Sequence, residues 1–407
     1  MKSLIAISLI VLPTFAAESD WPEFRGKTGQ GISAATGIPL KWSTTENVAW
    51  KVEVPGKGWS SPVVAAGKIY LTTALGESKI GAALHALCFD AKDGRLLWNT
   101  EVFQATAGAT SAMHQKNSLA SPTPIVTGDR LFVHFGHMGS AALDLAGKVV
   151  WKQTSLPYSP THGNGGSPVL ADGLLIFSCD AAPDPFLVAL DAATGKVRWK
   201  TPRDTTARKK FSFSTPLVIG GQFISPGSGL VGGYDVKTGK ELWRVGYGEG
   251  YSVIPRPVTA DGLVFVSSSF DKPVLKAIRL AGATGDVTES HVAWTLQKGA
   301  PHTPSMILSG DNLFCVSDAG IATCADLHTG EVHWTERLPG NYSASPVLAE
   351  GRLYFQSETG IGTVVKAAAT FEPLATNTLD EPTLASPAFI DGAVILRSEK
   401  HLWRFGK

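Results

Sequence analysis

The sequence has few charged residues and no long run of either sign. Asp, Glu, Lys and Arg make up 17% of 407 residues, and 36 basic against 35 acidic residues give a formal net charge of +1. This balance argues against a nucleic-acid partner or an acidic membrane surface. After the first residues, no segment approaches the ~18 apolar residues of a membrane-spanning helix. The first cysteine is Cys88, so no lipid anchor is expected either.

The start of the chain has the pattern of a cleavable signal peptide. One lysine precedes an apolar run over residues 4–12, and small residues follow at Ala16 and Ala17. We therefore expect a signal peptide over 1–17, a lead-in over 18–46 and a single domain over 47–407. The mature protein is expected to be a periplasmic or secreted monomer.

The common catalytic and metal-binding motifs are missing. The sequence has no GxSxG, Walker or HExxH motif, and its four cysteines have no CxxC spacing. In NLFCVSDAGIATCADL, a two-residue turn at Ala319 and Gly320 would place Cys315 opposite Cys324. This predicts either a cross-strand disulfide or two buried thiols. The remaining two, Cys88 and Cys179, are interpreted as core residues.

Glycine and proline are abundant instead, with 43 and 25 residues, and they recur in a repeat. Each of eight units opens with an apolar strand near a Ser/Thr-Pro or related pair, and a turn glycine follows five or six residues later. The repeat prolines are Pro62, Pro122, Pro168, Pro216, Pro257, Pro304, Pro346 and Pro387.

Each unit continues with three further strands, and the fourth carries a tryptophan four residues after a turn glycine, as in ATGKVRW. Four antiparallel strands in a radial repeat are typical of a β-propeller, so the sequence predicts an all-β, eight-bladed fold. Because the tryptophans recur with the blades, we expect them to dock each blade on its neighbour rather than to bind a cofactor. These are Trp50, Trp98, Trp151, Trp199, Trp243, Trp294 and Trp334.

The two ends of the repeat are complementary. The last unit supplies only three strands, and the strand around Trp50 has no preceding three, so it should complete the last blade and close the ring. The seventh unit lacks the tryptophan and offers Phe371 or Leu374 instead. In the lead-in, we expect Trp21, Phe24 and Arg25 to pack across the seam or to cap one end of the ring.

The loops before the repeat prolines should surround one mouth of the central channel, and they vary more than the strands. They form either a binding site or a solvated hydrophilic rim. Three histidines approach the axis in this arrangement, but their spacing in the sequence predicts no metal site. The candidates for ligand binding are Lys57, Trp59, His114, Asn117, His162, Asn164, Lys210, Tyr251, Arg256, His302, Tyr342 and Glu381.

The WPEFRGKTGQGIS lead-in, the ALDxxTGKxxW units and the ring closure resemble the PQQ-binding-like, or quinoprotein-like, β-propeller repeat family. This family is related to outer-membrane protein assembly factor B. The resemblance implies an eight-bladed ring with tryptophans docked between blades. The dehydrogenases of the family hold pyrroloquinoline quinone on the axis with calcium or a lanthanide, many against a ring formed by adjacent cysteines. This chain has no adjacent cysteine pair, and no segment of it matches their metal ligands.

Three hypotheses for the function follow, because one propeller frame serves many activities. The first is a binding or scaffolding module, not an enzyme, with an unidentified protein or small-molecule ligand at its loop-rich face. The second is a quinoprotein oxidoreductase that uses pyrroloquinoline quinone with calcium. The third is a subunit of the outer-membrane assembly machinery.

Overall fold

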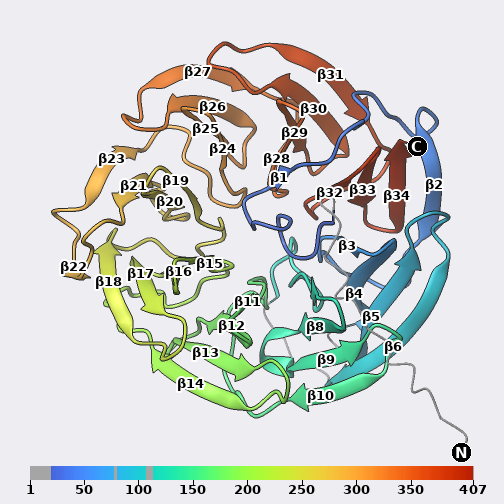
Figure 1. The fold of residues 1–407 in the computed structure, drawn as a ribbon, viewed down its shortest axis with the longest axis horizontal. Helices are drawn as coiled ribbons and strands as arrows, with labels where there is room; N and C mark the ends of the chain where they lie inside the picture. The colour runs from blue at the N-terminus through green and yellow to red at the C-terminus, as the bar shows by residue number, and fades with distance from the viewer. Residues whose placement is uncertain (1–19, 78–79, 107–112, 407) are drawn as a thin grey trace, which may run out of the picture.

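The computed structural model describes residues 20–77, 80–106 and 113–406. The expected signal peptide lies outside these ranges. The described chain consists of β-strands with one 3-10 turn, η1 (Gly136–Met138), and within it no helix is long and apolar enough to cross a membrane. Eight sheets surround a central axis (Figure 1), which confirms the predicted eight-bladed propeller of four-stranded antiparallel blades.

The blades follow one another along the chain, and in each the first strand lies nearest the axis (Figure 1). Blade 1 comprises β3 (Val63–Ala65), β4 (Lys68–Glu77), β5 (Gly81–Asp90) and β6 (Leu96–Ala105), and blade 2 comprises β7 (Ile125–Val126), β8 (Arg130–His134), β9 (Ser140–Asp144) and β10 (Val149–Gln153). Blade 3 comprises β11 (Val169–Ala171), β12 (Leu174–Cys179), β13 (Phe186–Asp191) and β14 (Val197–Pro202), and blade 4 comprises β15 (Leu217–Ile219), β16 (Gln222–Gly227), β17 (Leu230–Asp235) and β18 (Glu241–Gly246). Blade 5 comprises β19 (Val258–Ala260), β20 (Leu263–Ser267), β21 (Leu275–Arg279) and β23 (Val292–Leu296), and blade 6 comprises β24 (Ile307–Ser309), β25 (Asn312–Val316), β26 (Ile321–Asp326) and β27 (Val332–Arg337). Blade 7 comprises β28 (Val347–Ala349), β29 (Arg352–Gln356), β30 (Ile361–Lys366) and β31 (Pro373–Thr378), and blade 8 comprises β32 (Ala388–Ile390), β33 (Ala393–Arg397), β34 (His401–Gly406) and β2 (Val48–Glu53).

The N-terminal strand closes the ring as predicted. Antiparallel β2 pairs with β34, with Val48 opposite Phe405 and Glu53 opposite His401, so blade 8 is built from both ends of the chain. Two short strands add to this frame in parallel: β1 (Ile32–Ser33) pairs with β28, and β22 (Gly285–Asp286) pairs with β18.

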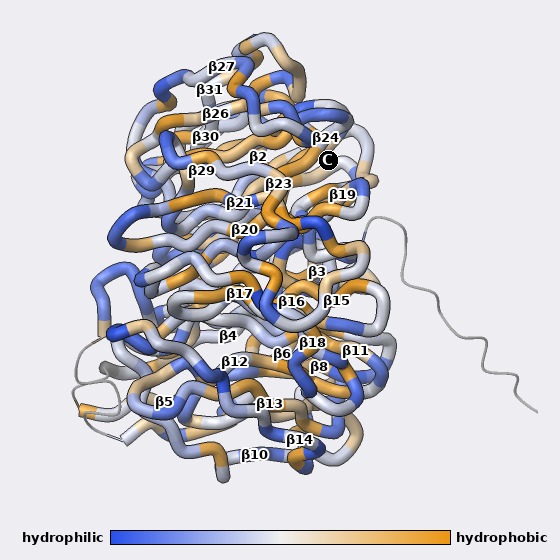
Figure 2. Tube along the Cα trace, turned by 90° about the vertical axis from the view of Figure 1, so that its left-hand side faces the viewer, coloured by the Kyte–Doolittle hydropathy of each residue, from blue (hydrophilic) through white to orange (hydrophobic). Residues whose placement is uncertain are grey.

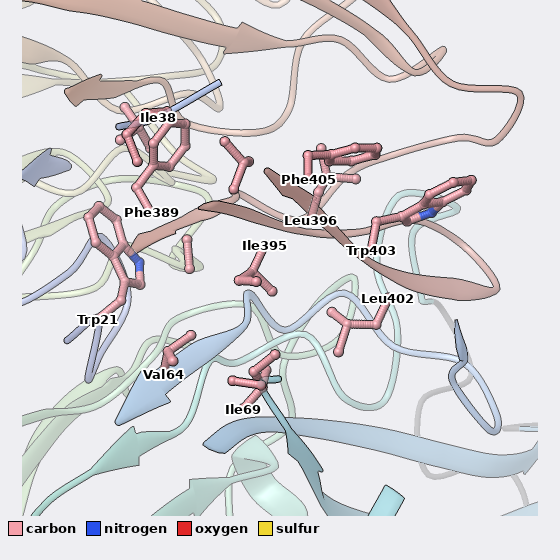
Figure 3. Packing of buried hydrophobic residues seen from close by; sticks show 14 of the residues in the cluster. Trp21, Ile38, Val64, Ile69, Phe389, Ile395, Leu396, Leu402, Trp403 and Phe405 are labelled. Carbon is pink, nitrogen blue, oxygen red and sulfur yellow. The ribbon is translucent and has the colours of Figure 1, made fainter. Parts of the chain in front are cut away.

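The hydrophobic core is divided into clusters that lie between neighbouring blades. The middle strands of the blades carry apolar residues at successive positions, as in FLVALD of β13, so both faces of a blade are apolar and each packs on the next sheet. Hydrophobic segments accordingly follow the strands, and hydrophilic ones concentrate at the turns (Figure 2). The largest cluster joins blades 7, 8 and 1 and includes Trp21, Phe389 and Trp403 (Figure 3).

The repeated tryptophans link the blades through their indole N–H groups as well as their rings. Six of the seven donate a hydrogen bond to a carbonyl oxygen of the next blade. These bonds, of 2.9 to 3.2 Å, run from Trp50 to Ala91, Trp98 to Leu145, Trp151 to Ala192, Trp199 to Val236, Trp294 to Leu327 and Trp334 to Ala368.

Trp243 differs from the other six. Its Nε1 donates to Gln222 Oε1 in its own blade at 2.8 Å, although the ring still packs in the core between blades 4 and 5. The reason lies in blade 5, where β22 pairs directly with β18, with Gly285 opposite Trp243.

In the seventh unit, neither predicted replacement takes the docking position. Register places Ala375 opposite Val364, as Trp334 lies opposite Cys324 in blade 6. The ring of Phe371 instead packs against Trp334, with ring centroids 5.1 Å apart. Leu374 is only partly buried beside the core of blades 7, 8 and 1.

The register of blade 6 also corrects the predicted cysteine pairing. Cys315 lies opposite Thr323, and Cys324 lies opposite Phe314, because the turn between β25 and β26 is longer than two residues. A one-residue shift turns the two side chains to opposite faces of the sheet. Both thiols are buried and free, and they belong to the cores on either side of blade 6.

Candidate functional site

The lead-in crosses the middle of the ring before it reaches β2 at the rim (Figure 1). We call residues 20–37 the plug. Backbone hydrogen bonds tie the plug to the innermost strands of blades 1, 2 and 7 and to the turn after β32 in blade 8. These bonds connect Trp21 with Val64, Pro22 with Val126, Gly31 with Leu348 and Thr36 with Gly392. The plug therefore packs across the axis of the ring, and its Trp21 also belongs to the core of blades 7, 8 and 1 at the seam.

Two buried arginines fasten the plug to blades 4, 5 and 6. Arg256 donates through Nη1 to the carbonyl of Phe24 at 2.5 Å and through Nη2 to Glu23 at 3.1 Å, while its Nε binds the carbonyl of Pro216. Arg25 donates to the carbonyl of Met306 at 2.5 Å. Burial and the nearby charge of Arg256 lower the pKa of Arg25 to about 9.

Above the plug, seven hydroxyl residues form a ring around the axis, which we call the hydroxyl ring. Each stands just before the first strand of a blade, and its Oγ accepts the backbone N–H of the corresponding residue in the preceding blade, over 2.9 to 3.1 Å. All seven are buried. The members are Ser61, Thr123, Ser167, Thr215, Ser305, Ser345 and Ser386.

The eighth position of this ring is Arg256, which precedes β19 and whose N–H is donated to Ser305. Its guanidinium is directed to the plug instead. The ring also corrects the repeat alignment in two units. Thr123 and Ser305 are the ring residues of blades 2 and 6. The position of the repeat proline is therefore held by Pro124 in blade 2 and by Met306 in blade 6, not by Pro122 and Pro304 as the repeat pattern predicts.

A cavity of about 600 Å³ opens above the hydroxyl ring, on the side of the variable loops. The plug contributes Phe24 to its lining, and all seven ring residues line it. Four more aromatic side chains contribute to the wall, namely Trp59, Phe213, Tyr251 and Phe270. The volume lies within the range of small-molecule sites.

Three histidines lie in the wall of this cavity, as the sequence predicts. His114 and His162 meet edge to face with ring centroids 5.7 Å apart, and the N–H of His114 donates to the carbonyl of His162. Asn117 Nδ2 donates to the same carbonyl at 2.8 Å. His162 has a φ of +67°, a left-handed conformation that is strained for a residue with a side chain. Burial, His162 and Lys116 together lower the pKa of His114.

The third histidine is supported by Asp318. One carboxylate oxygen of Asp318 accepts the N–H groups of His302 and Thr303, at 2.9 and 3.0 Å, and the other accepts the Thr303 hydroxyl. The His302 ring packs against Phe270 at a centroid distance of 4.8 Å. Asp318 is thus used largely to hold the loop.

The cation of the cavity, Lys116, is already paired. Its Nζ lies 2.6 Å from Glu358, which also accepts the hydroxyl of Ser343. With that pair neutralised, the carboxylate of Asp318 leaves the cavity wall with a formal charge of about −1. Outside it, Lys209 lies 3.8 Å from the ring centre of Tyr251.

The structure brings half of the predicted candidates to the cavity and separates the rest. Trp59, His114, Asn117, His162, Tyr251 and His302 line it. The others do not: Lys57 and Lys210 are outside the lining, Asn164 is buried beside His137, Arg256 anchors the plug, Tyr342 is buried between blades 6 and 7, and Glu381 binds His401 and Lys51 in blade 8.

Sequence reasoning missed the hydroxyl ring. The repeated Ser/Thr-Pro pairs were its signal, but we interpreted them only as the start of a strand. Phe24, Phe213 and Phe270 carried no such signal, because their loops do not repeat. Within the described ranges, no group of three or more His, Cys, Asp or Glu side chains is placed to hold a metal ion.

Comparison with known proteins gives a family and a fold. A family model described as outer membrane protein assembly factor BamB matches residues 40–179, 141–272 and 279–370. A lanthanide-dependent methanol dehydrogenase of Methylorubrum extorquens is 30% identical over 40% of this chain and 28% of its own length. A polyvinylalcohol dehydrogenase of a Sphingopyxis strain is 26% identical over 59% of this chain and 35% of its own length. The chain therefore spans about a third of these relatives.

Solved structures agree on the fold at low identity. BamB from Moraxella catarrhalis superposes with a TM-score of 0.63 at 12% identity, covering 88% of this chain and 97% of that one. A europium-containing methanol dehydrogenase superposes with a TM-score of 0.69 at 10% identity, covering 96% of this chain and 98% of that one. At such identities the likeness concerns the fold alone.

Proposed function

Because the chain belongs to the family whose model is described as outer membrane protein assembly factor BamB, we propose that it is an exported binding module whose ligand enters the central cavity from the loop-rich face. The observation that carries this proposal is the cavity itself, which the plug closes at one end and which is open on the side of the variable loops. The plug occupies the axis on one side, and the lining on the other combines aromatic rings with convergent polar groups. The hydrophobic leader supports a periplasmic or secreted location.

The polar groups of the cavity favour binding over catalysis. Among the described residues, no ion pair joins a cavity histidine to a carboxylate, which a general base commonly uses for orientation. Among the described residues, no hydrogen bond joins a ring hydroxyl to a histidine or a carboxylate, so no base is placed to activate these hydroxyls as nucleophiles.

The oxidoreductase hypothesis rests on the names of the relatives, methanol and polyvinylalcohol dehydrogenases. The lining does not fit a quinone cofactor held with a metal ion. Asp318 is the carboxylate of the lining, three hydrogen bonds already occupy it, and no further acidic residue joins it there. We therefore derive no oxidation step for this chain. The assembly-subunit hypothesis predicts co-purification with a membrane barrel protein.

A ligand screen tests the proposal directly. The purified chain is titrated with a library of small metabolites that includes pyrroloquinoline quinone, with and without calcium, and binding is followed by calorimetry. We expect ligands whose affinity falls about tenfold in Trp59→Phe, which removes one indole N–H from the cavity. Lys57→Ala is the matched control, since it changes the same loop outside the lining.

The outcomes separate the hypotheses. Saturable binding sensitive to Trp59→Phe but not to Lys57→Ala supports the binding module. Calcium-dependent, one-to-one uptake of the quinone would replace it with the oxidoreductase. If no compound binds, the cavity is not a small-molecule site and the proposal fails.

A further inference from the structure

Five aromatic side chains of the cavity wall are not used by the hydrophobic core. The docking tryptophans all belong to the core clusters between blades, but none of these five does. Each is half-buried and lines the cavity. Ring surface that the fold leaves exposed in a concave site is typical of ligand binding. The five are Phe24, Trp59, Phe213, Tyr251 and Phe270.

The same wall carries one negative charge without a counter-ion. Asp318 has no ion-pair partner among the described residues, whereas Glu358 neutralises Lys116 at 2.6 Å. Three hydrogen bonds hold the Asp318 carboxylate, from the N–H groups of His302 and Thr303 and from the Thr303 hydroxyl at 2.5 Å. These neutral donors fix the position of the carboxylate and leave its charge uncompensated.

The carboxylate and the rings meet on the side of blades 5 and 6. His302, whose N–H binds Asp318, packs against Phe270 with ring centroids 4.8 Å apart, and Phe270 packs against Tyr251 at 6.2 Å. Tyr251 already attracts one cation from outside the lining, since Lys209 Nζ lies 3.8 Å from its ring centre. Aromatic rings attract cations within about 6 Å of their centroids. This side of the cavity therefore combines a fixed negative charge with aromatic rings.

From these residues we propose that the cavity binds a small molecule that carries a quaternary ammonium group. The inference rests on the proposed function and names its class of ligand. Asp318 would repel an anion, and a neutral apolar ligand would cover the carboxylate without compensating its charge. A quaternary ammonium is attracted both by the carboxylate and by the rings, and it has no N–H that needs an acceptor.

A primary ammonium fits the same wall less well. It donates three hydrogen bonds, whereas the His302 loop fills three of the about four acceptor positions on the Asp318 carboxylate. The acceptors on Gln115 and on the histidine rings of the lining are neutral. A divalent metal ion takes about six oxygen ligands, and Asp318 is the single carboxylate of the lining. The aromatic wall therefore favours the organic cation.

The test compares choline with its neutral isostere 3,3-dimethylbutan-1-ol, in which carbon replaces the quaternary nitrogen. The two molecules have nearly the same shape and differ in charge. Each is titrated into the full chain by calorimetry at millimolar concentrations. We expect choline to bind at least about tenfold more tightly than the isostere. An increase in salt concentration should weaken the binding of choline and leave that of the isostere unchanged.

Three substitutions in the lining should change the affinity for choline in opposite directions. Asp318→Asn removes the charge at constant size and should weaken binding about tenfold. Phe270→Leu removes a ring and should weaken binding about three- to tenfold. Lys116→Gln leaves the charge of Glu358 uncompensated and should strengthen binding about two- to fivefold. Because Asp318 also holds the His302 loop, Lys116→Gln tests the charge with this loop intact.

Two matched controls remove the same charges outside the lining. Asp380→Asn and Lys210→Gln should each leave the affinity for choline within about twofold of the parent protein. Thermal unfolding of every variant confirms that the comparison is made between folded proteins.

Four results would overturn the inference. These are absence of choline binding, equal binding of the neutral isostere, tighter binding of the primary ammonium ethanolamine than of choline, and weaker rather than stronger binding by Lys116→Gln. If another ligand from the metabolite screen still depends on Trp59, the proposed binding function survives each of these failures.

Discussion

Trp42 fills the space that Ala375 leaves open at the seam between blades 7 and 8. In blades 1, 2, 5 and 6, the docking tryptophan packs on an aromatic residue of the second strand, such as Trp334 on Phe314. The equivalent aromatic residue in blade 7 is Tyr354, and Ala375 provides no ring for it. Trp42 stacks there instead, with ring centroids 6.1 Å from Tyr354 and 5.7 Å from Phe405. The lead-in is thus a structural part of the seam.

This relationship predicts a compensating pair of substitutions. Trp42→Ala should destabilise the fold by about 3–5 kcal/mol, since it removes a buried ring. Ala375→Trp alone should cost about 1–3 kcal/mol by overpacking against Trp42. Together, the two changes should cost less than their sum, because each ring uses the same space. Urea unfolding of the four proteins measures this coupling, and additive effects would show that the two sites are independent.

Two turn glycines of blade 3 provide a matched pair, because Gly195 lies against a docking tryptophan and Gly173 does not. Gly195 and Gly173 share a φ of +73°, so an alanine at either should cost about 1–2 kcal/mol for the left-handed backbone. A Cβ at Gly195 would also lie 2.5 Å from the Trp151 ring, whereas nothing lies within 4 Å at Gly173. We expect Gly195→Ala to cost about 1–3 kcal/mol more. Equal unfolding midpoints for the two variants would contradict this packing.

The plug depends on Arg256. Replacing it with Met leaves the Glu23 carboxylate and the carbonyl of Phe24 without their partner, which should destabilise the protein by about 3–5 kcal/mol. Glu23→Gln keeps an acceptor for the guanidinium and should cost less. Limited proteolysis should cleave within residues 20–37 of Arg256→Met and spare the parent protein. If the plug of Arg256→Met resists the protease, its backbone hydrogen bonds alone are enough to hold it in place.

His134 should make stability depend on pH. Burial, with a smaller contribution from the charge of His137, lowers the pKa of His134 to about 3 from its usual 6.5. Below pH 6.5 the unfolded chain binds a proton at His134, whereas the folded chain does not. The contribution of His134 to the free energy of unfolding is therefore fully present above pH 6.5 and decreases as the pH falls toward 3. At pH 4.5 the loss should be about 3 kcal/mol.

Denaturant unfolding at pH 7.5 and 4.5 measures this slope. His134→Gln should reduce the difference between the two pH values, whereas the exposed His333→Gln should not. An unchanged slope in His134→Gln would assign the acid sensitivity to other groups.

All four cysteines should be free thiols in protein purified without reductant. Each is buried, and burial raises the pKa of Cys88, Cys315 and Cys324 to about 12. A thiol reagent should therefore react with none of them in the native state and with four in guanidinium chloride. A count of two after unfolding would demonstrate the cross-strand bridge that the register of blade 6 opposes.

The repeat made the fold predictable from the sequence. Proline, glycine and tryptophan recur at similar spacing because each occupies the same structural position in successive blades. The number of blades and the closure of the ring could therefore be derived from the sequence. Two of the details that failed have local reasons. The turn before Ile321 is longer than its AG dipeptide suggests, which shifts Cys324 by one residue. The insertion that contains β22 redirects the indole of Trp243.

The cavity could be predicted only in part. His114, His162 and His302 were found because every loop before a first strand must reach the same mouth. Arg256 occupies a ring position too, but its long side chain turns away to the plug, a choice that depends on contacts with Glu23 and Phe24 more than 200 positions away. Such contacts have no local signal in the sequence.

The pairing of β2 with β34 also has a consequence for biogenesis. β2 is made early, yet its partner β34 lies more than 300 positions later in the chain, so blade 8 cannot assemble until that strand has left the ribosome. At typical elongation rates β2 waits on the order of tens of seconds with an open edge. A nascent chain of this design is exposed to intermolecular strand pairing for that whole period, and the edge of β2 is covered only when β34 has been made.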